Sequence, residues 1–433
     1  MGRIGPIIIA VFAGASALAA AELPAPDALF PAQDMAQVRL GQLLFYDPIL
    51  SGSGEVSCAT CHHPRFGTSD GLSLGLGDGA TGLGPERMID PDNLPEERVP
   101  RNAPALFNLG AAEFTRMFHD GRLEGDPDRP GGIRTPLGED MALGFASVLS
   151  AQSMFPVLAP DEMAGHYGEN DVSRAVRMGL LSSEGGAWDI ISARIESIPP
   201  YRAAFDAILG HGAAIHFTDI SDAIAAFIAH EWRADDSAFD RHLRGEAPLT
   251  GPALAGMELF YGEAGCSTCH AGQFQTDHAF HAIGMPQIGP GKKGRFETHY
   301  RDTGRLRVTG RAEDAYRFRT PSLRNVTLTA PYGHDGAYAT LEDVVRHHLD
   351  PIAALRGYDP AQAVLPDLAG AEDLHAFQDA VETDAIAAAN ELAPVTLSDA
   401  QVAELMAFLA ALTDDVSRLG VPPTVPSGLP VDQ

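Results

Sequence analysis

The stretch Ser57-Cys58-Ala59-Thr60-Cys61-His62 decides what this chain folds around, and it returns once as Gly265-Cys266-Ser267-Thr268-Cys269-His270. Both copies have the pattern C-x-x-C-H, which is the attachment signature of c-type haem. In such a motif the two thiols bind the porphyrin vinyl groups as thioethers, and the histidine that follows binds the iron. The motifs predict two haem c groups, the first held by Cys58, Cys61 and His62 and the second by Cys266, Cys269 and His270.

An isolated C-x-x-C more often marks a zinc or redox site. Zinc, however, needs further thiolates or a closed set of cysteine and histidine ligands. The chain has four cysteines, and the two motifs use all of them. We therefore favour covalent haem at both places.

Residues 1–21 are typical of a cleaved signal peptide. Arg3 is a short basic region, residues 7–20 are apolar, and small alanines follow. The apolar part is too short to span a bilayer comfortably, and no later stretch is apolar enough for a membrane helix. An uncleaved membrane anchor is the alternative. We expect export to the periplasm and no membrane span after cleavage.

The chain is strongly acidic, with 58 Asp and Glu against 30 Lys and Arg and a net charge of −28. This balance disfavours nucleic acid and anionic membranes as partners. It would attract a basic redox partner, although a solvated acidic surface explains it equally well.

The surroundings of the two haem motifs match each other in sequence. The shared features, in order, are G-x-x-L-F-Y (41–46 and 256–261), C-x-x-C-H (58–62 and 266–270), P-x-L-x-N (104–108 and 321–325) and H-D-G (119–121 and 334–336). Four matches in one order indicate two related haem domains. Ser398 with Gln401 has the pattern of a capping box that begins a last helix.

We expect a mainly α fold with two cytochrome c-like haem domains and long loops. The predicted divisions are an N-terminal haem domain at 22–245, a C-terminal haem domain at 246–420 and a tail at 421–433.

Two further stretches are specific enough to carry a resemblance. They are RTPSLRNVTLTAPY at 319–332, followed by His334-Asp335-Gly336, and AQSMFPVLAPDEM at 151–163. From Leu40 to about Thr413 the chain resembles the bacterial di-haem cytochrome c peroxidase family, which includes MauG-like enzymes. The resemblance implies that peroxide binds at the N-terminal haem and that the C-terminal haem passes electrons inward from a donor protein.

Glu162 matches the distal carboxylate of that family. Peroxide cleavage needs a base that takes a proton from one peroxide oxygen and returns it to the departing one. A surface glutamate is the alternative, because Asp161-Glu162 follows a proline.

His348 is the expected sixth ligand of the second haem. On a helix, Leu341, Val344, Val345 and His348 share one apolar face, whereas His347 would point about 100° away, toward water or a carboxylate. The family has Met or Tyr at this position, so a satisfied core histidine is the alternative, and Met257 and Met285 are the reserve ligands. Because Met/His ligation raises the haem potential, a His/His pair should lower it.

The first haem is expected to be open. Many family peroxidases block it with a histidine from the loop after the first motif, but the loop 74–79 here has none. His63 is too close to the proximal ligand to reach the other face. We expect a five-coordinate or water-bound iron that needs no reductive activation.

His119 stands where the family usually has a tryptophan between the haems. Histidine carries an electron hole less well than indole does. Electrons would therefore have to tunnel directly from haem to haem or pass through another aromatic residue. The alternative is that His119 is a structural hydrogen-bonding residue. His334 is expected near the second haem but not as a ligand.

The resemblance also implies a calcium ion between the domains. Its ligands match the side chain of Asn102 and the backbone carbonyls of Thr329 and Pro331, and oxygen ligands suit a hard cation. The alternative is that Asn102 only caps a turn.

These expectations describe an exported peroxidase that reduces hydrogen peroxide with electrons from a small cytochrome c or cupredoxin. The alternatives are a MauG-like di-haem oxidase that modifies a partner protein and a non-catalytic di-haem electron-transfer cytochrome. The resemblance also suggests a homodimer.

Overall fold

The computed structural model describes residues 22–166, 168–294, 296–414 and 416–432. The predicted signal peptide, residues 1–21, lies outside them. The described chain is mainly helical, as expected, with short strands and long loops between the helices. No helix in these ranges is long and apolar enough to cross a membrane.

The helices are α1 (Met35–Tyr46), α2 (Cys58–Cys61), α3 (Val148–Gln152), α4 (Asp171–Arg177), α5 (Ala187–Glu196), α6 (Pro199–Leu209), α7 (Phe217–Glu231), α8 (Ala238–Leu243), α9 (Gly251–Phe260), α10 (Leu306–Thr309), α11 (Leu341–Leu349), α12 (Pro351–Arg356), α13 (His375–Gln378), α14 (Ala380–Ala389) and α15 (Asp399–Ala410). The strands form small antiparallel sheets. They are β1 (Ala80–Thr81) with β2 (Met88–Ile89), then β3 (Arg116–Met117), β4 (Leu123–Gly125) and β5 (Ile133–Arg134) in that order, and β6 (Phe280–His281) with β7 (Phe318–Arg319).

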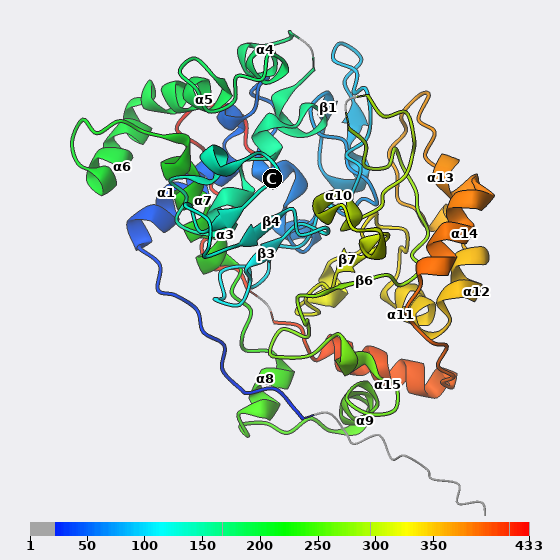
Figure 1. Ribbon diagram of the computed structural model, residues 1–433. Helices are drawn as coiled ribbons and strands as arrows, with labels where there is room; N and C mark the ends of the chain where they lie inside the picture. The colour runs from blue at the N-terminus through cyan, green and yellow to red at the C-terminus, as the bar shows by residue number, and fades with distance from the viewer. Residues whose placement is uncertain (1–21, 167, 295, 415, 433) are drawn as a thin grey trace, which may run out of the picture.

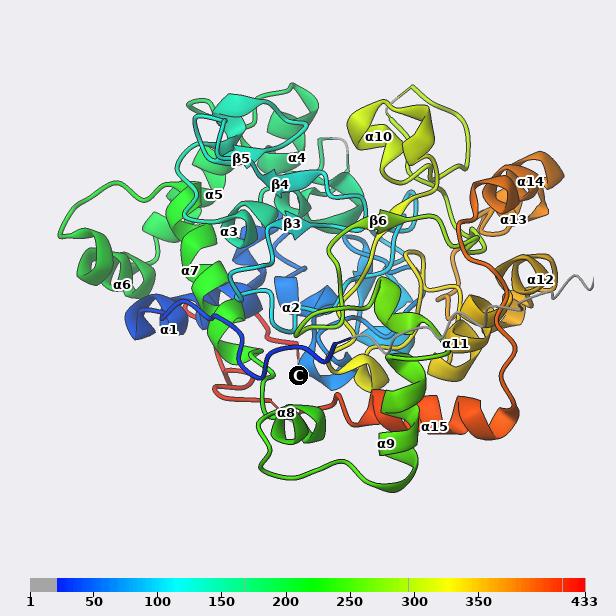
Figure 2. The same cartoon turned by 60° about the horizontal axis from the view of Figure 1, so that its bottom comes forward.

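The helices gather into two groups, with α1 and α3–α7 on one side and α9 and α11–α15 on the other (Figures 1 and 2). Each group encloses its own cluster of buried hydrophobic side chains. Leu74, from the loop after the first haem motif, belongs to the second cluster, and Phe274 belongs to the first. Each half therefore has its own core, and single side chains link the two.

Matching glycines mark the main helix crossing in each half. Gly41 on α1 lies so close to α7 that a Cβ atom would stand 1.8 Å from the carbonyl oxygen of Ala223. Gly256 on α9 has the same relation to α15, where a Cβ would stand 1.9 Å from the carbonyl oxygen of Glu404. These are the glycines of the two G-x-x-L-F-Y repeats, so the repeat exists because only glycine permits this close approach.

The P-x-L-x-N repeats are also matched in structure. Asn108 and Asn325 both have a positive φ, of 62° and 59°, which asparagine tolerates better than most residues. The Asn108 side chain accepts a hydrogen bond from the amide of Ala234, and Asn325 accepts one from the amide of Asp414. Each asparagine therefore fixes the chain just after the last long helix of its half.

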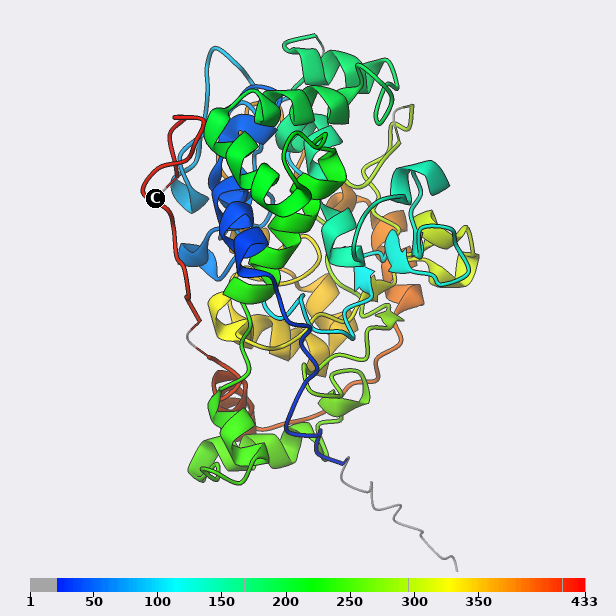
Figure 3. The same cartoon turned by 90° about the vertical axis from the view of Figure 1, so that its left-hand side faces the viewer.

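Ser398 caps α15 as predicted. Its side chain accepts a hydrogen bond from the amide of Gln401, and the Gln401 side chain accepts one from the amide of Ser398. Beyond α15 the chain returns along the first half (Figure 3). There Gln42 donates to the carbonyl oxygen of Gly420 at 2.8 Å, and Thr60 of the first haem motif donates to Asp432 at 2.7 Å.

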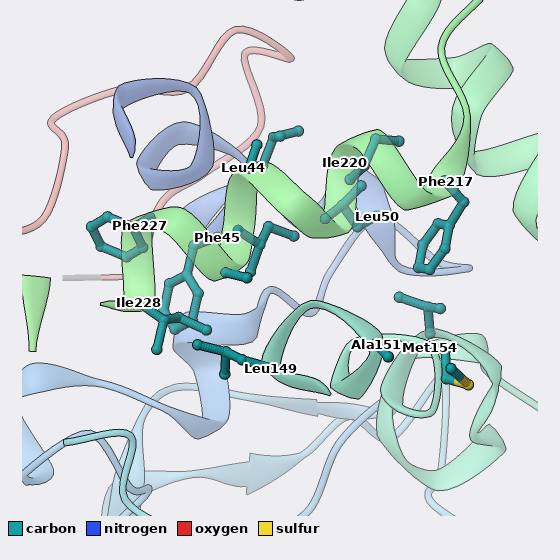
Figure 4. Packing of buried hydrophobic residues seen from close by; sticks show 14 of the residues in the cluster. Leu44, Phe45, Leu50, Leu149, Ala151, Met154, Phe217, Ile220, Phe227 and Ile228 are labelled. Carbon is teal, nitrogen blue, oxygen red and sulfur yellow. The ribbon is translucent and has the colours of Figure 1, made fainter. Parts of the chain in front are cut away.

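The first core lies directly beside the first haem motif. Helices α1, α7 and α3 pack together, with Leu149 next to Ile228 and Phe217 pointing toward Ala151 and Met154 (Figure 4). This packing forms one apolar wall of the cavity described next.

Candidate active site and haem centres

The first haem motif folds as the short helix α2, which ends at His62. The amide of His62 donates to the carbonyl oxygen of Cys58 at 2.9 Å. Its Nδ1 lies 3.0 Å from the carbonyl oxygen of Thr68. Because a carbonyl oxygen only accepts, Nδ1 carries the proton, and the lone pair of the neutral ring lies on Nε2. This is the state in which an imidazole binds iron.

A mostly apolar cavity opens beside this motif, and its wall contains Cys58, Cys61, His62 and Glu162 together. Much of the remaining wall is hydrophobic, formed by Phe45, Leu50, Val56, Leu106, Phe118, Leu149, Phe155, Phe217, Ile224 and Ile228. A concave apolar site with a few polar groups is what a bound cofactor requires. The residues present fit a haem attached to Cys58 and Cys61.

Glu162 reaches the cavity from a single π-helical turn, Pro160–Ala164. The loop 74–79 packs against this turn, where the amide of Asp78 donates to the carbonyl oxygen of Glu162 at 3.0 Å. Within this loop, which is fully described, only Gly75 contributes to the cavity wall. A glycine offers no side-chain ligand, so the loop leaves the cavity side of the site unblocked.

Asp161 is a neighbour of the site that the sequence did not single out. Burial raises the pKa of Asp161 to about 6, against the opposing effect of His166, whose Nε2 lies 3.5 Å from the Asp161 Oδ1. Asp161 is not among the residues that line the cavity, so its carboxyl group lies beside the site and not within it. In the sequence, only the position of Asp161 next to Glu162 could have pointed to this residue.

The second haem motif is built in the same way. The amide of His270 donates to the carbonyl oxygen of Cys266 at 2.9 Å, and its Nδ1 donates to the carbonyl oxygen of Gln275 at 2.9 Å. His348 on α11 donates from Nδ1 to the carbonyl oxygen of Val344 at 2.7 Å. Both imidazoles therefore keep Nε2 free, and their ring centroids lie 6.3 Å apart. The pair fits one iron held between two histidines.

The expectation that His347 faces water or a carboxylate is wrong. His347 is fully buried. Its Nε2 donates to the carbonyl oxygen of Ile283 at 2.8 Å, so Nδ1 accepts from the hydroxyl group of Tyr338 at 2.9 Å. A loop from elsewhere in the chain covers this face of α11, which helical periodicity alone could not reveal. Both His347 nitrogens are occupied, so His348 is the histidine of this pair that is available to a metal.

Met257 and Met285, the reserve ligands, are both buried in the second core cluster. Met285 also lines a small cavity together with Phe318 and His334.

A buried ion triad lies between the two halves. The Arg101 guanidinium contacts Asp120 of the first half at 2.8 Å and Asp302 of the second half at 2.6 Å. Burial alone would raise the pKa of both carboxyl groups, but Arg101, helped at Asp120 by Arg122, outweighs it and holds both pKa values well below their usual range. This cluster joins the two halves through charge as well as through packing.

The two H-D-G histidines lie close to this triad. His119 forms a hydrogen bond of 3.1 Å from Nε2 to the carbonyl oxygen of Asn102, and burial lowers its pKa to about 4. His334 stacks on Phe318 with ring centroids 3.7 Å apart. The His119 hydrogen bond supports the interpretation of this histidine as a structural hydrogen-bonding residue.

The donor chemistry of the predicted calcium ligands is consistent with a hard cation. Asn102 is buried, and its amide nitrogen donates to the carbonyl oxygen of Leu72 at 2.7 Å. This leaves the Asn102 Oδ1 available as an acceptor. The carbonyl oxygens of Thr329 and Pro331 accept no backbone hydrogen bond from the described part of the chain.

Gln152 and Lys292 also line the cavity, although the sequence did not single them out. Gln152 could have been noticed in the sequence as a polar residue in the mostly apolar stretch 151–163. Lys292 comes from the other half of the chain, so no local pattern could have placed it here.

Comparisons with known proteins identify a family for this chain. A family model described as di-haem cytochrome c peroxidase matches residues 35–248. The methylamine utilization protein MauG of Methylorubrum extorquens is 32% identical over 316 residues, which cover 72% of this chain and 68% of that protein. Cytochrome c551 peroxidase of Nitrosomonas europaea is 29% identical over 337 residues, covering 78% of this chain and 79% of that protein.

A solved structure is also similar. The crystal structure of a MauG-like protein associated with microbial copper homeostasis aligns with a TM-score of 0.57 and 26% identity, covering 93% of this chain and 96% of that one. Di-haem proteins of this kind carry two haem c groups, in agreement with the two C-x-x-C-H motifs. The chain belongs to the di-haem cytochrome c peroxidase family, which includes MauG, and is an oxidoreductase of the cytochrome-c peroxidase type.

Proposed function

We propose that this chain reduces hydrogen peroxide to water in the cavity that contains His62 and Glu162. Each turnover consumes one peroxide, two protons and two electrons and releases two water molecules. The observation that carries the proposal is that Glu162 and the iron-binding motif share one mostly apolar cavity. A plain electron-transfer cytochrome has no use for a carboxylate in that position.

A haem bound through Cys58, Cys61 and His62 supplies the redox-active iron for cleavage of the O–O bond. Glu162 takes a proton from one peroxide oxygen and returns it to the departing oxygen, which is general acid–base catalysis. The hydrogen bond from His62 Nδ1 to Thr68 keeps the imidazole in one orientation. The apolar wall limits the water that competes with peroxide.

Cys266, Cys269, His270 and His348 would hold the second haem, which would supply a redox centre that accepts electrons from a donor protein. The donor is a small redox protein, a cytochrome c or a cupredoxin. The net charge of −28 favours a donor with a basic docking face, because opposite charges steer association.

A MauG-like oxidase that modifies the side chains of a partner protein is the second candidate. Two observations favour it. His348 replaces the methionine that peroxidases of the family use, and the loop 74–79 places only Gly75 at the cavity. An open first haem and a low-potential second haem suit oxidation of a partner.

The remaining assignments complete the proposal. The mature protein works in the periplasm as two haem domains, 22–245 and 246–420, followed by the tail 421–433. A calcium ion bound by Asn102, Thr329 and Pro331 stabilises the region between them, and the protein forms a homodimer.

The variant Glu162→Gln tests the proposal. It keeps the shape of the side chain but cannot accept a proton, so the rate of peroxide reduction should fall by about 10²–10⁴-fold. Reduction of both haems by a small chemical reductant should be unchanged. Glu96→Gln is the matched control, because the Glu96 side chain is 69% exposed and its loss removes one nearby charge without touching the cavity. Full activity in Glu162→Gln would contradict the proposal.

A further inference from the structure

A loop from the second half of the chain reaches the cavity of the first half. Gly289 packs so tightly on Leu74 that a Cβ atom would stand 2.1 Å from the Leu74 Cδ1. Gly291 approaches Tyr300 equally closely, with 2.3 Å between a Cβ and the Tyr300 carbonyl oxygen. Both glycines have a positive φ, of 81° and 71°. The contact with Leu74 holds the loop against the first half, and the contact with Tyr300 fixes the position of the next residue within its own half.

That next residue, Lys292, lines the same cavity as Glu162 and His62. Its amide donates to the carbonyl oxygen of Arg301 at 3.0 Å, which anchors the base of its side chain. The neighbouring Lys293 behaves differently, because its ammonium group pairs with Glu97. Among the described residues, no carboxylate lies within ion-pair distance of the Lys292 ammonium group.

The charged groups that act on this ammonium group are Arg122, Glu162, Arg101 and Asp120. Burial, with a further contribution from Arg122, lowers the pKa of Lys292 to about 8, and Glu162 opposes the shift. Lys292 is therefore mostly protonated at neutral pH. Arg101 and Arg122 already pair with Asp120, which leaves Lys292 as a cation of this cavity without a carboxylate of its own.

We propose that Lys292 is a second catalytic residue, whose ammonium group binds the peroxide oxygen on which negative charge grows as the O–O bond lengthens. The proposal rests on the proposed function and deepens it. Glu162 carries the transferred proton, and Lys292 keeps its own protons and contributes charge and a hydrogen bond. A positioned donor of this kind is worth about 10²–10³ in rate when it acts only on the developing charge. By the same chemistry the cavity should bind small anions.

The test uses the full-length holoprotein in its fully oxidised form. Fluoride is titrated against the wild type, Lys292→Met and Lys293→Met, and binding is followed by the optical spectrum of the first haem. Met matches the length of the lysine stem, and Lys293→Met is the matched control because it removes the same charge from the adjacent residue. Lys292→Arg restores the charge.

The expected result is a dissociation constant for fluoride at least about tenfold higher in Lys292→Met, with Lys293→Met and Lys292→Arg close to the wild type. Peroxide reduction should fall in Lys292→Met by about 10²-fold or more. Haem content and the thermal unfolding midpoint establish that each variant is folded.

One outcome would overturn the proposal while leaving the proposed function intact, namely that Lys292→Met binds fluoride as the wild type does. If the midpoint potential of the first haem also shifts in that variant, Lys292 lies at a haem propionate. If the wild type itself binds no fluoride, the open cavity is wrong, and both the proposed function and this inference fail.

Discussion

The ring centroids of His270 and His348 lie 6.3 Å apart, and both residues have Nδ1 hydrogen-bonded to a backbone carbonyl oxygen. An imidazole nitrogen binds a metal at about 2.0 Å, so an iron held by both residues would need the two nitrogens about 4 Å apart. The rest of the 6.3 Å corresponds to the distance from each nitrogen to its own ring centre. The spacing of this pair therefore supports our proposal that His348 is the sixth ligand of the second haem.

The variant His348→Met should raise the midpoint potential of the second haem. Met/His ligation favours the reduced iron more than His/His ligation does, and axial ligands span about 0.8 V, so we expect a rise on the order of 0.1 V or more. A redox titration followed by optical spectroscopy measures it. His347→Gln is the control and should leave the ligand set unchanged, since both His347 nitrogens are hydrogen-bonded to the protein. An unchanged midpoint potential of the second haem in His348→Met would show that His348 does not bind the iron.

Arg101 should be among the most important residues for stability. Replacing it with Met leaves the buried carboxylates of Asp120 and Asp302 without their shared partner, and breaking a buried ion pair in this way costs about 3–5 kcal/mol. Chemical denaturation at neutral pH measures the loss. Arg129→Met, which removes an exposed partner of Glu139, should leave the stability nearly unchanged. A loss in Arg101→Met no larger than in this control would show that the triad does not hold the halves together.

The Arg101→Met variant should also change how the unfolding free energy depends on pH. In the wild type the pKa values of Asp120 and Asp302 lie below the unfolded value of about 3.9, so their contribution is complete above that pH and is lost as the pH falls further. Without Arg101, burial should raise the pKa of Asp302 above the unfolded value, whereas the pKa of Asp120, which keeps Arg122 as a partner, should rise less. The variant should therefore gain stability as these carboxyl groups bind protons. The difference in unfolding free energy between wild type and Arg101→Met should therefore shrink from pH 7 to pH 4. A constant difference would exclude this linkage.

Local patterns in the sequence predicted much of the framework. The two C-x-x-C-H motifs predicted haem c, and the stretches 319–332 and 151–163 led to the family, which the comparisons confirm. The capping box at Ser398 and Gln401 is present. The G-x-x-L-F-Y repeats mark corresponding helix crossings through Gly41 and Gly256. These features depend on residues near one another in the chain, which is why they could be found without a structure.

Features that depend on distant segments could not be predicted. His347 was expected at the surface, but the chain around Ile283 covers it. Lys292 enters the cavity from the other half of the molecule, and the Arg101 triad joins loops from both halves. Periodicity describes one helix at a time and carries no information about the loop that packs over it.

The most direct test of the central claim is rapid mixing of the fully oxidised wild type with one equivalent of hydrogen peroxide, followed by optical spectroscopy. The loop 74–79 leaves the cavity beside His62 and Glu162 unblocked, so we predict an immediate change in the haem spectrum that is strongly slowed in Glu162→Gln. No reaction until the second haem has been reduced would contradict this account, because another residue would then have to block the first iron.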